Sequence, residues 1–231
     1  MSLPLAIVDY RLPKEAVSRL QEFANIHLFN AKGLTFDAVD GHPDIFVFQI
    51  DNQLVIARNT PQSCINALNK YAISFQYGQR EVGFDVASST AYNCLVTKYL
   101  LFHKKDATDG VISELCGNKQ FINLPQPFTR CSLFSFGDNH FITSDRGIHK
   151  VLEANKLSSC FIDSSDILLP PYKNGFIGGC LGVYKNTVFL SGSINHLKDG
   201  LLLKSFVESN GYQLIELYSG AVLDVGGLFF V

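Results

Sequence analysis

The middle of the chain shows a regular order of apolar and polar segments. Apolar positions predict a strand over 133–136, a Gly-Asp-Asn turn follows, and a second strand is expected over 140–143, which together indicate a β-hairpin. Asp145 then has the side chain of a helix N-cap, and apolar residues recur at helical spacing from Ile148 onward. A third apolar strand is expected over 160–162. The order of this unit is therefore strand, strand, helix, strand.

The same order recurs elsewhere along the chain. Apolar hairpins followed by a helical pattern and another apolar strand are found in residues 44–76, 92–123 and 179–217. In the first of these copies, Thr60 and Pro61 predict a helix N-cap and a first-turn proline. Self-similarity at a period of roughly 40 residues is typical of propellers and repeat arrays. Four units are therefore expected to lie wholly inside the chain.

The two ends of the chain supply the parts of a fifth unit. The pattern predicts a strand over 226–231 at one end, and a strand over 5–10, a helix over 13–24 and a strand over 26–29 at the other. We therefore expect an α+β fold, a five-fold pseudosymmetric α/β propeller of five ββαβ units in one domain, 1–231. The C-terminal strand would pair with the N-terminal segment and leave no exposed sheet edge. An open α/β sandwich with accidental internal similarity is the alternative.

Composition and charge exclude several classes of partner. Hydrophobic residues make up 47% of the chain, with 19 Phe and 9 Tyr, which predicts an extensive core. The formal net charge is −2 and no run of basic residues exceeds a Lys-Lys pair, so no nucleic-acid partner is expected. No apolar run reaches the about 18 residues of a membrane span, and the first residues lack the features of a secretory signal. We therefore expect a cytoplasmic protein without a membrane partner; the sequence leaves the oligomeric state open.

The cysteines are widely spaced. Six of them, with no CxxC pair, stand at positions 64, 94, 116, 131, 160 and 180. This spacing argues against a zinc or redox motif, so neither a metal nor another cofactor is expected. In a chain of this length without a secretory signal, the thiols are expected to be reduced and mostly buried.

Several stretches of the chain resemble a known fold family. The stretches are "DGHPDIFVFQIDNQLVIA", "TRCSLFSFGDNHFITSDRGI", "LLPPYKNGFIGGCLG" and "VLDVGGLFFV". They resemble an uncharacterised bacterial family assigned to the pentein, or guanidino-group modifying enzyme, fold. Arginine deiminase, dimethylarginine dimethylaminohydrolase, the glycine amidinotransferase group and a non-catalytic ribosome anti-association factor have that fold. The resemblance covers essentially the whole chain and implies a fold, but no particular activity.

The resemblance also implies where a site would lie and what it lacks. Pentein enzymes bind substrate in a central channel, where the first strands of the units begin, and a cysteine attacks the guanidinium carbon. That cysteine follows a Gly-Gly pair near the C-terminus, and its position corresponds here to Phe230. Since phenylalanine has no nucleophilic atom, the standard catalytic cysteine is missing and ordinary guanidino hydrolysis is in doubt.

Small, polar and ionisable residues gather where the first strand of each unit begins. In a closed ring these positions converge, so they predict one polar pocket on an apolar scaffold. Glycines at such a centre are expected where backbone segments approach closely. The candidate ligand-binding residues are His42, Asn93, Ser132, Gly178, Gly179 and Asp224.

The candidate catalytic residues are Cys131, His196 and Asp44. Cys131 follows Arg130, whose charge would lower the pKa of the thiol; the alternative is a buried thiol at a strand start. His196 lies in a His-Leu-Lys stretch that resembles the one holding the catalytic histidine of the enzymes; an exposed histidine before a helix is the alternative. Asp44, like Asp224, either binds a cationic substrate or accepts hydrogen bonds from turn amides.

Two functions are compatible with these residues. The first is a non-catalytic ring that binds a small polar or cationic ligand in a central channel. The second is a guanidino-modifying hydrolase or transferase that uses Cys131 as its nucleophile, with Cys180 and His42 as further candidates. The sequence leaves open whether the protein is an enzyme.

Overall fold

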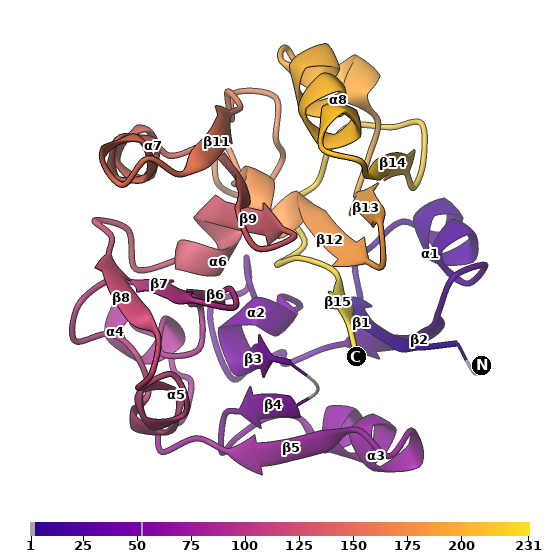
Figure 1. The fold of residues 1–231 in the computed structure, drawn as a ribbon. Coiled ribbons are helices and arrows are strands. Elements are labelled where there is room, and N and C mark those ends of the chain that lie inside the picture. Colours follow the sequence, from indigo (N-terminus) through magenta and orange to yellow (C-terminus); the bar gives the residue numbers. More distant parts are fainter. Residues whose placement is uncertain (1–2, 52) are drawn as a thin grey trace.

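The computed structural model describes residues 3–51 and 53–231, and within them the strands form five three-stranded sheets. The sheets lie around a common centre, with the longer helices on the outside (Figure 1). In each sheet the central strand pairs antiparallel with one neighbour and parallel with the other. A helix joins the two parallel strands, because a parallel connection requires a crossover.

Most of the strands have only four or five residues, so each sheet is a small unit. Together with the 3-10 helices η1 and η2, the elements in chain order are β1 (Leu5–Asp9), α1 (Lys14–Leu20), β2 (Asn25–Phe29), α2 (Pro43–Phe46), β3 (Val47–Ile50), β4 (Gln53–Ile56), α3 (Gln62–Lys70), β5 (Ser74–Tyr77), α4 (Val86–Ser89), β6 (Leu95–Val96), β7 (Leu100–His103), α5 (Gly110–Leu115), β8 (Gln120–Asn123), α6 (Thr129–Ser132), β9 (Leu133–Phe136), β10 (His140–Thr143), α7 (Arg146–Ala154), β11 (Ser158–Phe161), η1 (Ile177–Cys180), β12 (Leu181–Tyr184), β13 (Thr187–Leu190), η2 (Ile194–His196), α8 (Gly200–Ser209), β14 (Gln213–Glu216) and β15 (Phe229–Phe230).

The first and last strands belong to one sheet, as the sequence predicts. β15 pairs antiparallel with β1, and Ala6 lies opposite Phe230. Reciprocal backbone hydrogen bonds between Leu5 and Val231, of 2.9 and 2.8 Å, extend the pairing to the last residue. Figure 1 shows the C-terminal end lying beside the N-terminal strand. The fifth unit is therefore assembled from both ends of the chain, and an open sandwich, the alternative, is wrong because the strands form separate small sheets.

The unit in the middle of the chain follows its predicted pattern closely. β9 and β10 form the hairpin, and the Asp145 side chain accepts a hydrogen bond of 2.8 Å from the backbone N–H of Ile148 at the start of α7. Ile148 and Leu152 are fully buried on the inner side of that helix. Apolar residues at helical spacing therefore bury one face of α7 against its sheet, which is the main stabilisation of so short a helix.

Several local predictions are wrong, and the strands expected to begin at residues 92 and 179 begin at 95 and 181. The strand expected to begin at Asp44 begins three residues later, because Asp44 lies in the short helix α2. Pro43 at the start of that helix fixes φ in the helical range, which favours a helical turn over an extended start. Thr60 does not cap α3: its hydroxyl donates to the Ala57 carbonyl at 2.8 Å, and Pro61 stands at the N-cap position.

The cysteines and the helices were both the subject of a prediction from the sequence. All six cysteines are free and buried. In the part of the chain that the structure describes, each helix is too short or too polar to cross a membrane.

Candidate functional site

The starts of three units meet at the centre of the molecule. Cys131, on α6, donates its thiol hydrogen to Oδ2 of Asp44, on α2, over 2.9 Å. Asn93, just before β6, donates to the backbone carbonyl of Asp44 at 3.1 Å and lies 3.3 Å from Sγ of Cys131. All three residues are buried. The predicted convergence of Asp44, Asn93 and Cys131 is therefore present in the structure.

Asp224 occupies the same centre from the fifth unit. Its carboxylate accepts hydrogen bonds from the backbone N–H groups of Phe176, at 2.8 Å, and Gly226, at 3.2 Å. The carboxylate lies so close to Gly179 that any Cβ there would overlap it. Glycine is therefore required at position 179 because Asp224 occupies the space of a side chain.

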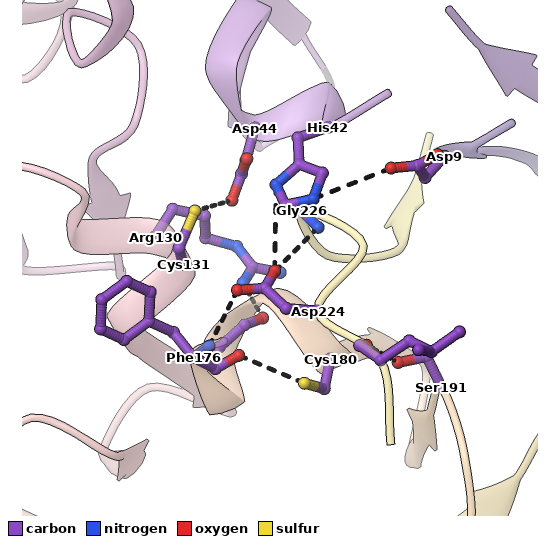
Figure 2. Close-up of polar contacts among 12 residues, drawn as sticks. Asp9, His42, Asp44, Arg130, Cys131, Phe176, Cys180, Ser191, Asp224 and Gly226 are labelled. Atoms are coloured by element: carbon purple, nitrogen blue, oxygen red, sulfur yellow. Dashed lines mark hydrogen bonds and ion pairs between the residues drawn. The ribbon is translucent and has the colours of Figure 1, made fainter. Parts of the chain in front are cut away.

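His42 lies between two carboxylates. Its Nε2 is 3.8 Å from Oδ2 of Asp9, at the end of β1, and its Nδ1 is 3.9 Å from Oδ1 of Asp224 (Figure 2). Both distances exceed a hydrogen bond, and the imidazole is completely buried. Within residues 3–51 and 53–231, neither ring nitrogen of His42 nor Oδ1 of Asp44 has a hydrogen-bond partner. Because an unsatisfied buried polar atom costs about 1–3 kcal/mol, three of them in one cluster suggest a site that is completed by another group.

Burial sets the charge of this cluster. It raises the pKa of Asp44 to about 6 and that of Asp224 to about 6, which leaves both carboxyl groups mostly ionised at neutral pH. It also raises the pKa of the Cys131 thiol well above its ordinary value, and it lowers the pKa of His42 below its ordinary value. With the thiol and the imidazole neutral, the two carboxylates outweigh the single guanidinium of Arg130 that interacts with them, so the cluster carries a net negative charge.

Arg130 does not activate Cys131 as the sequence suggested. Its guanidinium donates hydrogen bonds to the backbone carbonyls of Gly178, at 2.7 Å, and Leu181, at 3.2 Å. It also lies over the rings of Phe134 and Phe229. The guanidinium thus interacts with these carbonyls and rings rather than with the thiol. Burial has the larger effect on Cys131, so the pKa of its thiol is raised rather than lowered.

A cavity of about 370 Å³ opens over this cluster. Polar side chains of His42, Cys131, Asn174 and Asp224 contribute to it, and the remaining lining is apolar. The side-chain oxygen of Asn174 is buried and has no hydrogen-bond partner. Among the described residues that line the cavity there is no Lys or Arg; the apolar and aromatic ones are Phe36, Val39, Val86, Phe128, Leu169, Tyr172 and Phe176.

Some predicted site residues lie elsewhere. His196 is exposed, donates from Nε2–H to the Ser219 carbonyl at 3.0 Å, and does not line the cavity. Ser132 is buried without a hydroxyl partner and does not line the cavity. Gly178 packs against the backbone of Arg130 and Cys131, so it shapes the centre without presenting a ligand. Cys180 donates to the Phe176 carbonyl at 3.2 Å.

Phe230 belongs to the apolar core. Its ring stacks on Tyr184 at 5.5 Å between centroids and packs against Phe189 at 5.0 Å. It is 7% exposed and does not line the cavity above the cluster. Phe230 therefore serves packing in this structure.

Sequence reasoning missed several residues of the site. Asp9 follows a buried apolar strand, and its carboxylate accepts three hydrogen bonds from the Arg11 guanidinium in addition to facing His42. An acidic residue at the end of an apolar strand was a visible signal. Asn174 and Phe176 lie in a connection between units, where no periodicity indicates which side chains turn inward.

Solved structures of low sequence identity have the same fold. Dimethylarginine dimethylaminohydrolase from Pseudomonas aeruginosa, in complex with citrulline, has a TM-score of 0.56 and 9% identity, over 94% of this chain and 92% of that one. Agmatine deiminase from C. jejuni has a TM-score of 0.59 and 10% identity, over 94% and 87% of the two chains. An amidinotransferase of saxitoxin biosynthesis from Microseira wollei has a TM-score of 0.54 and 12% identity, over 97% and 94%. These likenesses establish the pentein fold.

Sequence comparison places the chain in a family. A search of curated proteins found no match. Residues 7–229 match the model of a family of unknown function, DUF6873, so the match spans nearly the whole chain. The expected resemblance to a pentein family of uncharacterised proteins is confirmed. The protein therefore belongs to the DUF6873 family and has the pentein fold.

Proposed function

We propose that the protein binds a small molecule with a planar cationic head, such as a guanidinium or amidinium group, in the cavity above Asp224. The observation that carries this proposal is the charge of the cavity: it is lined by the buried carboxylate of Asp224, and none of its described lining residues is Lys or Arg. Asp44 lies behind Cys131 and adds a second negative charge. A buried charge is expensive unless it is paired, so an incoming cation would gain more here than in water.

The walls of the cavity favour the same kind of ligand. Phe36, Phe128, Tyr172 and Phe176 place aromatic rings around the negative floor. A cation over an aromatic face gains about 0.5–2 kcal/mol, and a flat head fits between rings better than a tetrahedral one. Guanidino-modifying enzymes among the structural neighbours are consistent with this ligand class.

The ring itself would hold this site together. In our proposal the five sheets form a closed pentein propeller, and the pairing of β15 with β1 completes it. The cluster takes Asp9 from β1 and Asp224 from the segment before β15. Asp9 and Asp224 stand near opposite ends of the chain. Closure would therefore bring their two carboxylates to the same imidazole, that of His42.

Benzamidine and benzamide test the charge requirement, because the two compounds share a shape and differ in charge. We expect benzamidine to bind and benzamide to bind at least about tenfold more weakly, which corresponds to about 1.4 kcal/mol. Replacing Asp224→Asn should weaken benzamidine binding by a similar factor or more, since it removes a charge-assisted contact. Isothermal titration calorimetry measures all three affinities.

The matched control is Glu114→Gln on α5, which removes an exposed carboxylate away from the cavity. It should leave the benzamidine affinity unchanged. Equal binding of benzamide and benzamidine, or equal binding of benzamidine by wild type and Asp224→Asn, contradicts the proposal.

Nucleophilic catalysis by Cys131 is the second candidate. It is favoured by one observation: Cys131 lines the cavity, and its Sγ lies 2.9 Å from a carboxylate oxygen of Asp44. Asp44 would take the thiol proton, the thiolate would form a bond to the guanidinium carbon, and the C–N bond would break as the leaving amine takes that proton from Asp44. Water or a second amine would then attack the same carbon, break the C–S bond and restore the thiol. The raised pKa of the thiol opposes this chemistry, because little thiolate forms before substrate binds.

Alkylation by iodoacetamide separates the two candidates. In folded protein at pH 6 we expect Cys131 to react no faster than Cys64 or Cys160, because burial raises the pKa of all three thiols. After denaturation the three should react at similar rates. Mass-spectrometric mapping of the adducts against time gives the rates. Labelling of Cys131 at least tenfold faster than the other two would instead favour the enzyme.

A further inference from the structure

We propose that His42, Asp44 and Cys131 form a binding site for a divalent transition-metal ion such as Zn²⁺. One imidazole nitrogen, one carboxylate oxygen and the thiol sulfur all lie within 4.8 Å of one another, and all three residues are buried. Figure 2 shows the three side chains pointing toward one another from α2 and α6. The inference goes beyond the proposed function, because it concerns a different ligand and a set of side chains that does not include Asp224.

Unpartnered atoms supply a second, independent observation. Nδ1 and Nε2 of His42 and Oδ1 of Asp44 are buried and have no hydrogen-bond partner in the described part of the chain. A metal ion would accept lone pairs from one imidazole nitrogen and from the carboxylate. It would therefore satisfy atoms that otherwise lower the free energy of unfolding of the native protein.

The donor set selects the kind of ion. Imidazole, thiolate and carboxylate are ligands of Zn²⁺ and Co²⁺, whereas Ca²⁺ and Mg²⁺ take oxygen ligands. Three protein ligands leave a fourth position of a tetrahedral ion for a water or a ligand, and both His42 and Cys131 border the cavity. On binding, Cys131 forms a sulfur–metal bond and releases its proton to solvent.

Neighbouring groups would orient these ligands. Asn93 donates a hydrogen bond to the Cys131 sulfur and another to the Asp44 backbone carbonyl. Whichever ring nitrogen of His42 binds the ion, the other faces a carboxylate, Asp9 at 3.8 Å or Asp224 at 3.9 Å. A small shift of the ring on binding would turn that contact into a hydrogen bond, and such a carboxylate partner fixes the orientation of a metal-binding imidazole. The thiolate and Asp44 together supply the two negative charges that match a divalent ion.

Cobalt titration tests the site without any mutation. We expect chelator-treated wild-type protein to bind one equivalent of Co²⁺, with the intense visible bands of four-coordinate cobalt and a near-ultraviolet sulfur-to-cobalt charge-transfer band. One equivalent of Zn²⁺ should remove these bands by displacement, since Zn²⁺ binds such a site more tightly than Co²⁺. Absence of the charge-transfer band in the wild type overturns the proposal.

Two cysteine variants then assign the sulfur. Cys131→Ser should lose the charge-transfer band and bind Co²⁺ about 100-fold more weakly or worse. Cys160→Ser, which changes a buried thiol on β11, should retain both. A band that persists in Cys131→Ser contradicts the assignment, and circular dichroism checks that both variants fold. Benzamidine binding measured with chelator present tests the proposed function separately, so either result can fail without the other.

Discussion

Removal of residues 226–231 should unfold the protein. The deletion takes away β15, which pairs with β1, and with it the buried rings of Phe229 and Phe230. Loss of a buried Phe side chain lowers the free energy of unfolding by about 3–5 kcal/mol. The loss of two is comparable to the whole free energy of unfolding of a domain, which is about 5–15 kcal/mol. The strand β1 would also be left with an unpaired edge. Circular dichroism and urea denaturation of the truncated chain measure the effect.

A point variant tests the same junction when the truncated chain is insoluble. Phe230→Ala should lower the free energy of unfolding by about 3–5 kcal/mol, because the ring packs between Tyr184 and Phe189. Phe121→Ala is the control, since Phe121 is 42% exposed on β8 and should cost much less. A truncated protein with the wild-type unfolding midpoint, or equal losses in the two variants, would show that the junction of the chain ends contributes little.

The repeats could be predicted because each unit carries its own periodic pattern. The hairpin of β9 and β10 and the capped helix α7 follow from apolar spacing and one Asp side chain, which are local properties. The unit split between the chain ends could be recognised because its missing strand lies at the other terminus. Local patterns do not show how the chain folds at the centre of the molecule. The start of β3 was predicted too early, because Pro43 and the crowded centre favour a helical turn there.

The site could be predicted only in part, because its members come from different units. The convergence of Asp44, Asn93, Cys131 and Asp224 follows from aligning the repeats, which is sequence information. The pairing of His42 with Cys131 and Asp44 as possible metal ligands does not, since 87 residues separate Cys131 from Asp44 and no spacing motif relates them. The prediction for His196 was misleading because a local sequence likeness to a catalytic stretch does not show where the side chain points. In the structure His196 is exposed to solvent.

The Asp44→Asn variant, without metal, should gain free energy of unfolding relative to wild type as the pH rises. Burial raises the pKa of Asp44 to about 6, from an ordinary value of 3.8. The carboxyl group therefore favours folding while it is protonated, below pH 3.8, and this contribution is lost as the pH rises through 6. Asparagine has no such titration. The difference in unfolding free energy between variant and wild type should thus shift by about 2.4 kcal/mol in favour of the variant between pH 4 and pH 7.5.

Urea denaturation at the two pH values, with chelator present, measures that shift. Effects that do not change with pH, such as altered packing around the amide, cancel in the difference. His103, whose pKa burial lowers to about 4, destabilises both proteins alike as the pH falls through this range, so it cancels as well. An unchanged difference between the two pH values would show that Asp44 is not held as a strained buried carboxylate. A shift of the expected size, together with loss of Co²⁺ binding in the same variant, would mean that the folded protein keeps Asp44 at a cost in stability because a bound cation requires it.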